Sequence, residues 1–342
     1  MIAEIYDVIV VGAGPTGLAC GIEAARANLN FVLIEKGCLV NSLYSYPANM
    51  TFFTSRELLE IGGLPLPSIN VKPTRAEALE YYRRVADHYS LPIRYGERVT
   101  AISAIAAGAG DADNGRFQIE SELEDGTRRC TLAHKVIIAS GYYDLPNLMG
   151  IPGENLPKVS HYAREGHEFF QRRVAVIGGA NSAAVTSLNL YRHGAEVTII
   201  CRESTLSSHI KYWIRPDIEN RIKAGSIQAM FESVVTEIAP GFILVRRASG
   251  EIERLENDFV FALTGYHPDV DLLRNAGVQV DPESLRPACN LETLESNVPG
   301  LYLAGVVISG VHTNEIFIEN GRFHGKQIID DILSKSARAG VR

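Results

Sequence analysis

Two glycine-rich turns in this chain have the residue types and spacing that bind the pyrophosphate of a dinucleotide. One spans residues 12–17 and the other spans residues 178–183, and each follows a short run of buried-type aliphatic residues. A turn of this kind, between a strand and a helix, brings backbone N–H groups and the positive helix end to the phosphates. The sequence therefore predicts two nucleotide-binding units.

The first turn has the full glycine motif. Gly12 is expected to make the tight turn, Gly14 to let the pyrophosphate approach the backbone, and Gly17 to allow close packing of the helix. Pro15 and Thr16 lie between these glycines and open the helix. All five residues are predicted to contact the cofactor.

The second turn departs from the motif. Gly178 keeps the turn position, whereas Ala180 and Ala183 replace the later glycines. Alanine suits the helix-packing position but is crowded nearer the phosphate. Asn181 and Ser182 offer side-chain donors at the expected helix start, where an anion would lie.

The residues that follow the next strand of each unit differ in charge. Glu35 follows the first such strand and is suited to accept hydrogen bonds from a ribose diol, whereas Arg202 follows the second and suits a 2′-phosphate. Lys211 would add positive charge there and Glu203 would reduce it. An exposed Arg202 with no ligand is the competing interpretation. The pair predicts FAD in the first unit and NADPH in the second, as in a flavoprotein that takes hydride from NADPH.

Composition narrows the remaining classes. The chain has 342 residues, a net charge of −7 and a pI near 5.8, which suggests two domains and gives no basic face for nucleic acid. The five cysteines are scattered without a CxxC pair, and no metal-ligand motif is present. No apolar run is long enough to span a membrane, and the start of the chain leads directly into a strand. We expect a cytoplasmic protein without a metal.

These motifs require an α/β fold with two Rossmann-like domains. We expect an FAD-binding domain in two parts, 1–157 and 271–342, with the NADPH-binding domain 158–270 inserted between them. Small-residue turns at Ala139–Gly141 and at Gly265 end one strand in each domain and support a duplication.

Further elements are expected around this frame. Helices are predicted at about 16–28 and at 74–90, the latter opened by a capping box, and antiparallel strands at 97–131 with a flexible turn at 106–115. A helix starting near Asn314 would direct its positive end at the flavin.

Longer blocks carry a resemblance to a known family. They comprise residues 34–37, 40–42, 46–47, 51–53, 141–144, 264–269 and 314–325. In these the chain resembles the thioredoxin-reductase-like flavoproteins, and within them the bacillithiol disulfide reductases (YpdA type). The resemblance implies FAD, NADPH, a homodimer or homotetramer, and reduction of the symmetric disulfide of a low-molecular-weight thiol.

The resemblance and the motifs together give the remaining predicted cofactor contacts. These are Lys36, Asn41, Ser42, Thr51, Val99, Ala139, Gly141, Gly265, Gly305, Glu315 and Ile316. Thr16 and His324 are the candidates for a catalytic task, because Thr16 opens the first helix and His324 adjoins the final one.

Two departures from the family keep the acceptor open. The CxxC of thioredoxin reductases is missing, and Thr16 stands where the resembled reductases carry a cysteine. Threonine cannot form a mixed disulfide, and Cys20, one turn deeper, is predicted to be core. A reductase of ferredoxin, flavodoxin or quinones is therefore the alternative function, with a small carrier protein as partner. A redox-sensing flavoprotein that is not an enzyme is a third.

Overall fold

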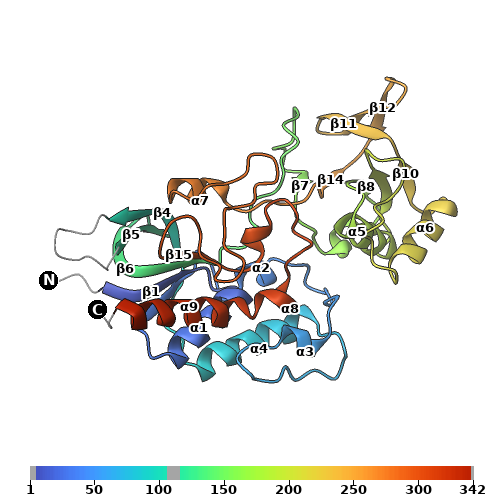
Figure 1. Ribbon diagram of the computed structural model, residues 1–342. Coiled ribbons are helices and arrows are strands. Elements are labelled where there is room, and N and C mark those ends of the chain that lie inside the picture. Colours follow the sequence, from blue (N-terminus) through green and yellow to red (C-terminus); the bar gives the residue numbers. More distant parts are fainter. Residues whose placement is uncertain (1–4, 106–115, 340–342) are drawn as a thin grey trace. The chain divides into compact units, whose positions relative to one another are not determined.

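The computed structural model describes residues 5–105 and 116–339 (Figure 1), so the predicted turn at 106–115 lies outside the described residues. The chain forms two compact units. Unit 1 consists of Met1–Ser45, Met50–Leu145 and Tyr266–Arg342, and unit 2 of Tyr46–Asn49 and Pro146–Gly265. The second unit thus interrupts the first. The domain limits predicted at 157 and 270 stay a prediction.

Unit 1 is built on a seven-stranded sheet of order β3-β2-β1-β6-β5-β4, with β15 paired to β6. Strands β1, β2, β3, β6 and β15 form parallel pairs, whereas β4, β5 and β6 pair antiparallel. The strands are β1 Ile5–Val11, β2 Phe31–Ile34, β3 Ile93–Arg94, β4 Glu97–Ile105, β5 Arg116–Leu123, β6 Arg128–Ile138 and β15 Leu301–Leu303. Central β1 is buried on both faces, which accounts for its unbroken aliphatic run.

Helices α1 and α9 pack against each other beside this sheet (Figure 1). The helices of unit 1 are α1 Pro15–Arg26, α2 Asn41–Tyr44, α3 Arg56–Leu59, α4 Arg75–His88, α7 Val270–Asn275, α8 Ile318–Gly321 and α9 His324–Ala339, with a 3-10 turn at Gly305–Ser309. The capping box of α4 is present, because Thr74 and Glu77 exchange hydrogen bonds between side chain and backbone.

The prediction of a helix beginning near Asn314 is wrong. α8 begins at Ile318 and is a single turn, and α9 begins only at His324. The Asn320 side chain binds the backbone of the residues before α8: it accepts a hydrogen bond from Phe317 N–H and donates one to the Glu315 carbonyl. A side chain that bonds the backbone in this way competes with helix formation.

Unit 2 contains a five-stranded parallel sheet of order β10-β9-β8-β14-β7 and a three-stranded antiparallel sheet of β11, β12 and β13. Its elements are β7 Val159–Ser160, β8 Arg173–Ile177, α5 Asn181–Arg192, β9 Glu196–Ile200, α6 Arg215–Lys223, β10 Gln228–Met230, β11 Ser233–Ile238, β12 Phe242–Arg247, β13 Ile252–Glu256 and β14 Phe259–Ala262. The proline-rich segment before β7 belongs to this unit, because Met149, Ile151 and Leu156 pack against its core. Within the described residues no helix has the length and hydropathy to cross a membrane.

Candidate functional site

The two glycine-rich turns are built alike. A Cβ on Gly12 would lie 2.6 Å from the Ala139 carbonyl oxygen, and a Cβ on Gly178 would lie 2.6 Å from that of Leu263. Each carbonyl belongs to the small-residue turn that ends the neighbouring strand. Both glycines also have positive φ, +104° and +137°. A side chain at either position is therefore excluded both by the close contact and by the backbone conformation. The repeated turn thus fits around the glycine in each unit.

The other two glycines of the first turn have the tasks that the motif assigns. A Cβ on Gly17 would lie 2.0 Å from the Gly12 carbonyl oxygen, which explains why the helix can pack so closely. A Cβ on Gly14 would meet nothing within 4 Å. Gly14 therefore faces open space at the start of α1, where a pyrophosphate needs room. In unit 2 Ala183, the third residue of α5, takes the packing position and is buried.

Glu35 lies beside the first turn. Its carboxylate accepts hydrogen bonds from Ala13 N–H at 2.8 Å and from Gly37 N–H at 3.0 Å. Burial raises the pKa of Glu35, and these two backbone donors and Lys36 oppose the rise. A carboxylate can accept about four hydrogen bonds, so lone pairs remain for a ribose diol. The residues present fit the adenosine half of FAD.

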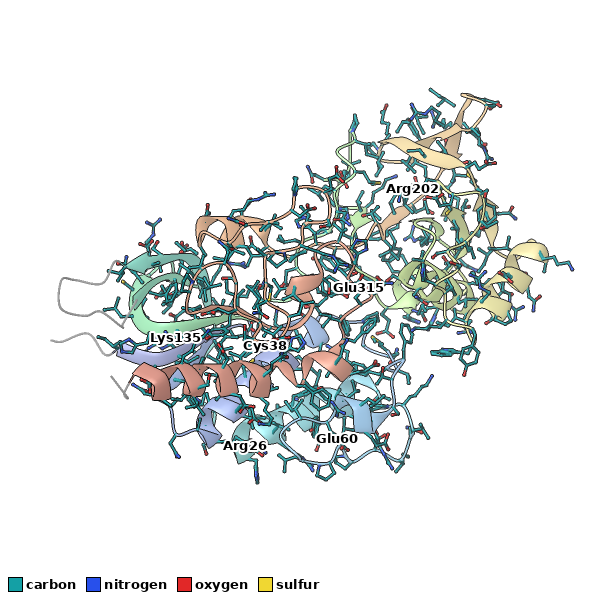
Figure 2. The ribbon with its side chains drawn as sticks, viewed as in Figure 1. Arg26, Cys38, Glu60, Lys135, Arg202 and Glu315 are labelled. Atoms are coloured by element: carbon teal, nitrogen blue, oxygen red, sulfur yellow. The ribbon has the colours of Figure 1, made fainter. Side chains whose placement is uncertain are left out.

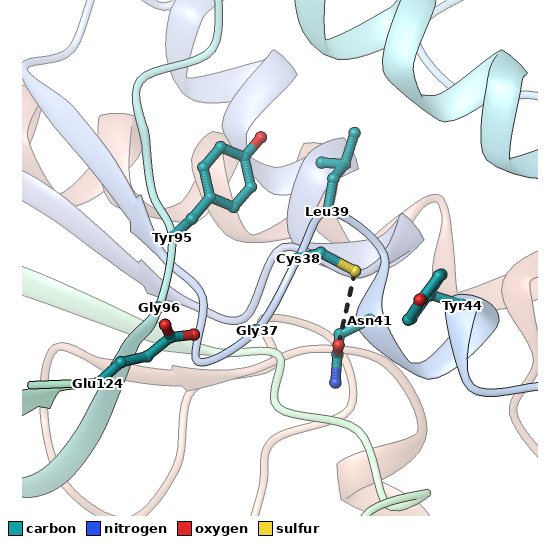
Figure 3. A pocket seen from close by; sticks show the side chains of 8 residues that line it. All are labelled: Gly37, Cys38, Leu39, Asn41, Tyr44, Tyr95, Gly96 and Glu124. Carbon is teal, nitrogen blue, oxygen red and sulfur yellow. Dashed lines mark hydrogen bonds between the residues drawn. The ribbon is translucent and has the colours of Figure 1, made fainter.

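A cavity of about 630 Å³ opens at the same edge of unit 1, past the ends of β2 and β3 (Figure 3). It is lined by Gly37, Cys38, Leu39, Asn41, Tyr44, Tyr95, Gly96 and Glu124. The predicted contact Asn41 is among these residues, and its Oδ1 accepts a weak hydrogen bond from Cys38 Sγ at 3.6 Å. Tyr95 and Glu124 belong to no recognised motif, so their place in the cavity could not be predicted from the sequence.

Thr16 and His324 are brought together at Gly305. A Cβ placed on Gly305 or on Gly321 would lie 3.0 Å from Thr16 Oγ1 in either case, so Thr16 fills a niche between two glycines. His324 Nδ1 accepts a hydrogen bond from Gly305 N–H at 3.0 Å. Burial lowers the pKa of His324 to about 4, so the ring is neutral near pH 7 with its proton on Nε2.

Glu315 is held by a residue that the motifs did not indicate. Arg286 donates to both carboxylate oxygens of Glu315, at 2.6 and 2.8 Å. This pair holds the Glu315 side chain next to the predicted cofactor contact Ile316. Glu315 is labelled in Figure 2. Because the two residues are far apart in the chain, only the fold reveals the contact.

The other predicted residues of unit 1 are spread along it. Asn41 and Ser42 open α2, and Thr51 forms an isolated β-bridge with Thr74 and is exposed. Val99 lies on β4.

In unit 2 the side chain of Asn181 is engaged with its own protein. It donates to the His209 carbonyl at 3.0 Å and accepts from Lys211 N–H at 3.0 Å. The loop that carries Lys211 thus uses the amide oxygen and one amide N–H of Asn181, and donation of the other amide N–H to a phosphate stays a prediction. Ser182, the next residue of α5, is exposed.

Arg202, which is labelled in Figure 2, is exposed. Its side chain is 83% exposed and its Nε lies 3.2 Å from Glu203 Oε1. An exposed pair of this kind contributes little to stability, so the guanidinium is accessible to a ligand. The backbone of Gly265, at the far end of β14, accepts a hydrogen bond from Asn147 N–H.

All five cysteines lie within the described residues and are free thiols, and no two have the CxxC spacing of a local redox pair. Cys20 is fully buried, and burial raises its pKa to about 12. Burial also raises the pKa of Cys289 to about 11. Thiolates are the reactive form of cysteine, so neither side chain is a competent nucleophile near pH 7. Within the described residues no group of His, Cys, Asp and Glu is placed to hold a metal.

Two dinucleotide sites of this construction in one chain define a flavin and nicotinamide oxidoreductase. The family model described as pyridine nucleotide-disulphide oxidoreductase matches residues 9–305. The chain belongs to this family, uses FAD and NADPH, and is a flavoprotein oxidoreductase.

Individual relatives are similar to this chain in sequence and structure over nearly its full length. The chain is 43% identical to bacilliredoxin reductase Bdr of Bacillus subtilis, over 96% of this chain and 97% of that protein. The structure of bacillithiol disulfide reductase Bdr (YpdA) from Bacillus cereus superposes with a TM-score of 0.92 at 42% identity, covering 97% of this chain and 100% of that one. Thioredoxin reductase of T. acidophilum shares the fold, with a TM-score of 0.72 at 23% identity over 97% of this chain and 99% of that one. The predicted fold class and family are confirmed.

Proposed function

We propose that this enzyme reduces the disulfide of a low-molecular-weight thiol of the bacillithiol type at the expense of NADPH. The observation that carries the proposal is the full-length relationship to reductases named for that disulfide and for bacilliredoxin, on a chain with an acid at the first ribose position and a base at the second. When bound, FAD supplies the two-electron chemistry that links the nucleotide to the disulfide. One NADPH and one proton are consumed for each disulfide, and two thiols are released.

The protein's own residues would bind and orient rather than form covalent bonds. Thr16 has no thiol, and buried Cys20, with a pKa of about 12, cannot replace it. We propose that Thr16 shapes the niche between Gly305 and Gly321.

His324 is neutral near pH 7, which makes it a poor proton donor. We therefore propose that it is a positioning residue that holds the Gly305 backbone through the Nδ1 hydrogen bond. The remaining predicted contacts of unit 1, including Asn41, Ser42 and Ile316, are proposed to bind FAD, and Ser182, Arg202 and Lys211 to bind NADPH.

A second candidate function follows from the cysteines. Since burial raises the pKa values of Cys20 and Cys289 to about 12 and about 11, we propose as the alternative that electrons pass from the flavin to a small carrier protein or a quinone without any enzyme thiol. This function needs no chemistry at position 16. A homo-oligomer working in the cytoplasm is proposed for either function.

An anaerobic titration separates the two functions. The flavin is reduced with NADPH, bacillithiol disulfide is added, and flavin absorbance and released thiols are followed together. We expect reoxidation of the flavin with two thiols for each NADPH consumed. A flavin that NADPH reduces, but that the disulfide leaves reduced while ferredoxin, flavodoxin or a quinone reoxidises it, contradicts disulfide reduction and supports the second candidate.

A further inference from the structure

An ion pair joins the two segments that flank the first glycine-rich turn. Lys36 Nζ lies 2.6 Å from Asp144 Oδ2, and the two side chains are 25% and 28% exposed. Lys36 follows β2, and Asp144 follows β6. Asp144 itself is not among the predicted cofactor contacts.

The strand order places this pair across the dinucleotide crevice. Strand β1 lies between β2 and β6, and all three run parallel, so their carboxyl ends meet at one edge of the sheet. The turn that leaves β1 is bonded to both neighbours, because Gly12 N–H donates to the Ile34 carbonyl and Ala139 N–H donates to the Val11 carbonyl. A contact between the segments that follow β2 and β6 therefore spans the edge at which β1 delivers its glycines.

The pair is also within electrostatic reach of the predicted ribose acid. Beyond the larger effects of burial and backbone hydrogen bonds, Lys36 lowers the pKa of Glu35 and Asp144 raises it. Their opposed charges therefore act on the pKa of Glu35 in opposite directions. The sheet itself is held by its backbone ladder, so the fold does not need this contact.

We propose that Asp144 is a positioning residue that holds Lys36 across the crevice, and that the resulting Lys36–Asp144 bridge slows the release of bound FAD. The inference rests on FAD binding in unit 1 and not on the identity of the electron acceptor. A bridge between two segments acts only when both partners are present. Loss of either residue should therefore have the same consequence as loss of both.

A direct contact between Lys36 and FAD would have a different signature. Lys36 would then matter by itself, and removal of Asp144 would leave the lysine free to bind the cofactor more tightly. The two explanations predict opposite results for the Asp144 variant, and this difference makes the test decisive.

The experiment measures FAD release from the holoprotein by the recovery of flavin fluorescence after dilution. The variants are Lys36→Met, Asp144→Asn and the double variant. We expect each of the three to release FAD about fivefold faster than the wild type, in line with one partly exposed ion pair. Added salt should speed release from the wild type more than from the variants, because it screens only an intact pair. Asp144→Glu should restore part of the slow release.

Matched controls come from the exposed Lys326–Asp330 pair on α9, which joins the same residue types at 2.8 Å. Lys326→Met and Asp330→Asn should leave FAD release unchanged. Faster release from Lys36→Met with normal or slower release from Asp144→Asn would overturn the bridge in favour of a direct lysine contact. Additive effects in the double variant, or no effect in any variant, would overturn it as well. A protein that fails to reduce the disulfide but shows the expected release rates refutes the proposed acceptor and leaves the bridge intact.

Discussion

At the scale of single residues, the choice between NADPH and NADH depends on Arg202 and its neighbour. Arg202→Ala should raise the KM for NADPH about tenfold or more, because hydrogen bonds to charged groups contribute ~1.5–3 kcal/mol, and should leave the KM for NADH unchanged. Glu203→Gln should lower the KM for NADPH by a smaller factor, since it frees the guanidinium from its 3.2 Å contact. Steady-state kinetics with both nucleotides measure this. Equal losses for NADPH and NADH in the Arg202 variant would show that Arg202 does not bind the 2′-phosphate.

A second residue-scale prediction concerns pH. Burial lowers the pKa of His324 to about 4, whereas the unfolded chain should titrate near its ordinary value of about 6.5. Between these pH values the unfolded chain binds a proton that the folded protein does not, so stability is full above the higher value and is lost as pH falls. His324→Asn keeps an acceptor for Gly305 N–H and should flatten this part of the profile.

The measurement for His324 is urea unfolding of the FAD-free protein between pH 4 and 7. His324→Ala serves as the companion variant, because it leaves the Gly305 N–H without its acceptor and should be about 1–3 kcal/mol less stable than His324→Asn at every pH. Identical pH profiles for the wild type and His324→Asn would rule out a shifted His324 as the cause.

At the scale of elements, the glycines of the first turn should separate folding from binding. Gly14→Ala meets nothing within 4 Å at a φ that is not positive, so the FAD-free protein should keep its stability to within about 0.5 kcal/mol. The new methyl group would fill the space left for the pyrophosphate, and FAD affinity should fall at least tenfold. Gly12→Ala, at φ +104°, should destabilise the fold itself.

Denaturant unfolding and FAD titration of the two variants test this pair. Normal FAD affinity in a folded Gly14→Ala protein would mean that the pyrophosphate does not approach the backbone there.

Elements also show where prediction from sequence succeeds. The strand, turn and helix around Gly12 could be predicted because the motif is local, and the α4 capping box because Thr74 and Glu77 are three residues apart. The start of α8 differs from the prediction because the Asn320 side chain bonds the backbone at Phe317 and Glu315. The Arg286–Glu315 contact could not be predicted, since the two residues meet only through the fold.

Polar side chains near a motif are the least predictable part of the site. Asn181 stands at the start of a helix, where donors often face an anion, yet both ends of its amide bind the 209–211 loop. A single sequence does not reveal which loop will reach such a group. By contrast, the positions of Glu35 and Arg202 could be predicted, because each residue follows an apolar strand whose end can be located from its residue pattern.

At the scale of the whole molecule, the chain enters unit 1 in three separate segments, and this predicts which segments each cofactor protects from amide hydrogen exchange. A ligand stabilises the part of the protein that it binds by RT ln(1 + [L]/Kd), which is about 2.7 kcal/mol at a hundredfold excess over Kd. FAD should therefore slow amide hydrogen exchange in all three segments of unit 1, although they are distant in sequence. NADP⁺ should slow exchange mainly in Pro146–Gly265.

Hydrogen exchange with mass spectrometry on the full chain, with FAD, with NADP⁺ and with both, tests this division. Gly178→Ala is the matched variant, because its Cβ would strike the Leu263 carbonyl as that of Gly12 would strike Ala139. It should abolish protection by NADP⁺ while FAD still protects unit 1. If NADP⁺ instead protected the Gly12 turn in the wild type, NADP⁺ would bind unit 1, and the assignment of FAD to unit 1 and NADPH to unit 2 would be wrong. In that case the charges of Glu35 and Arg202 could not be the features that select between the two cofactors.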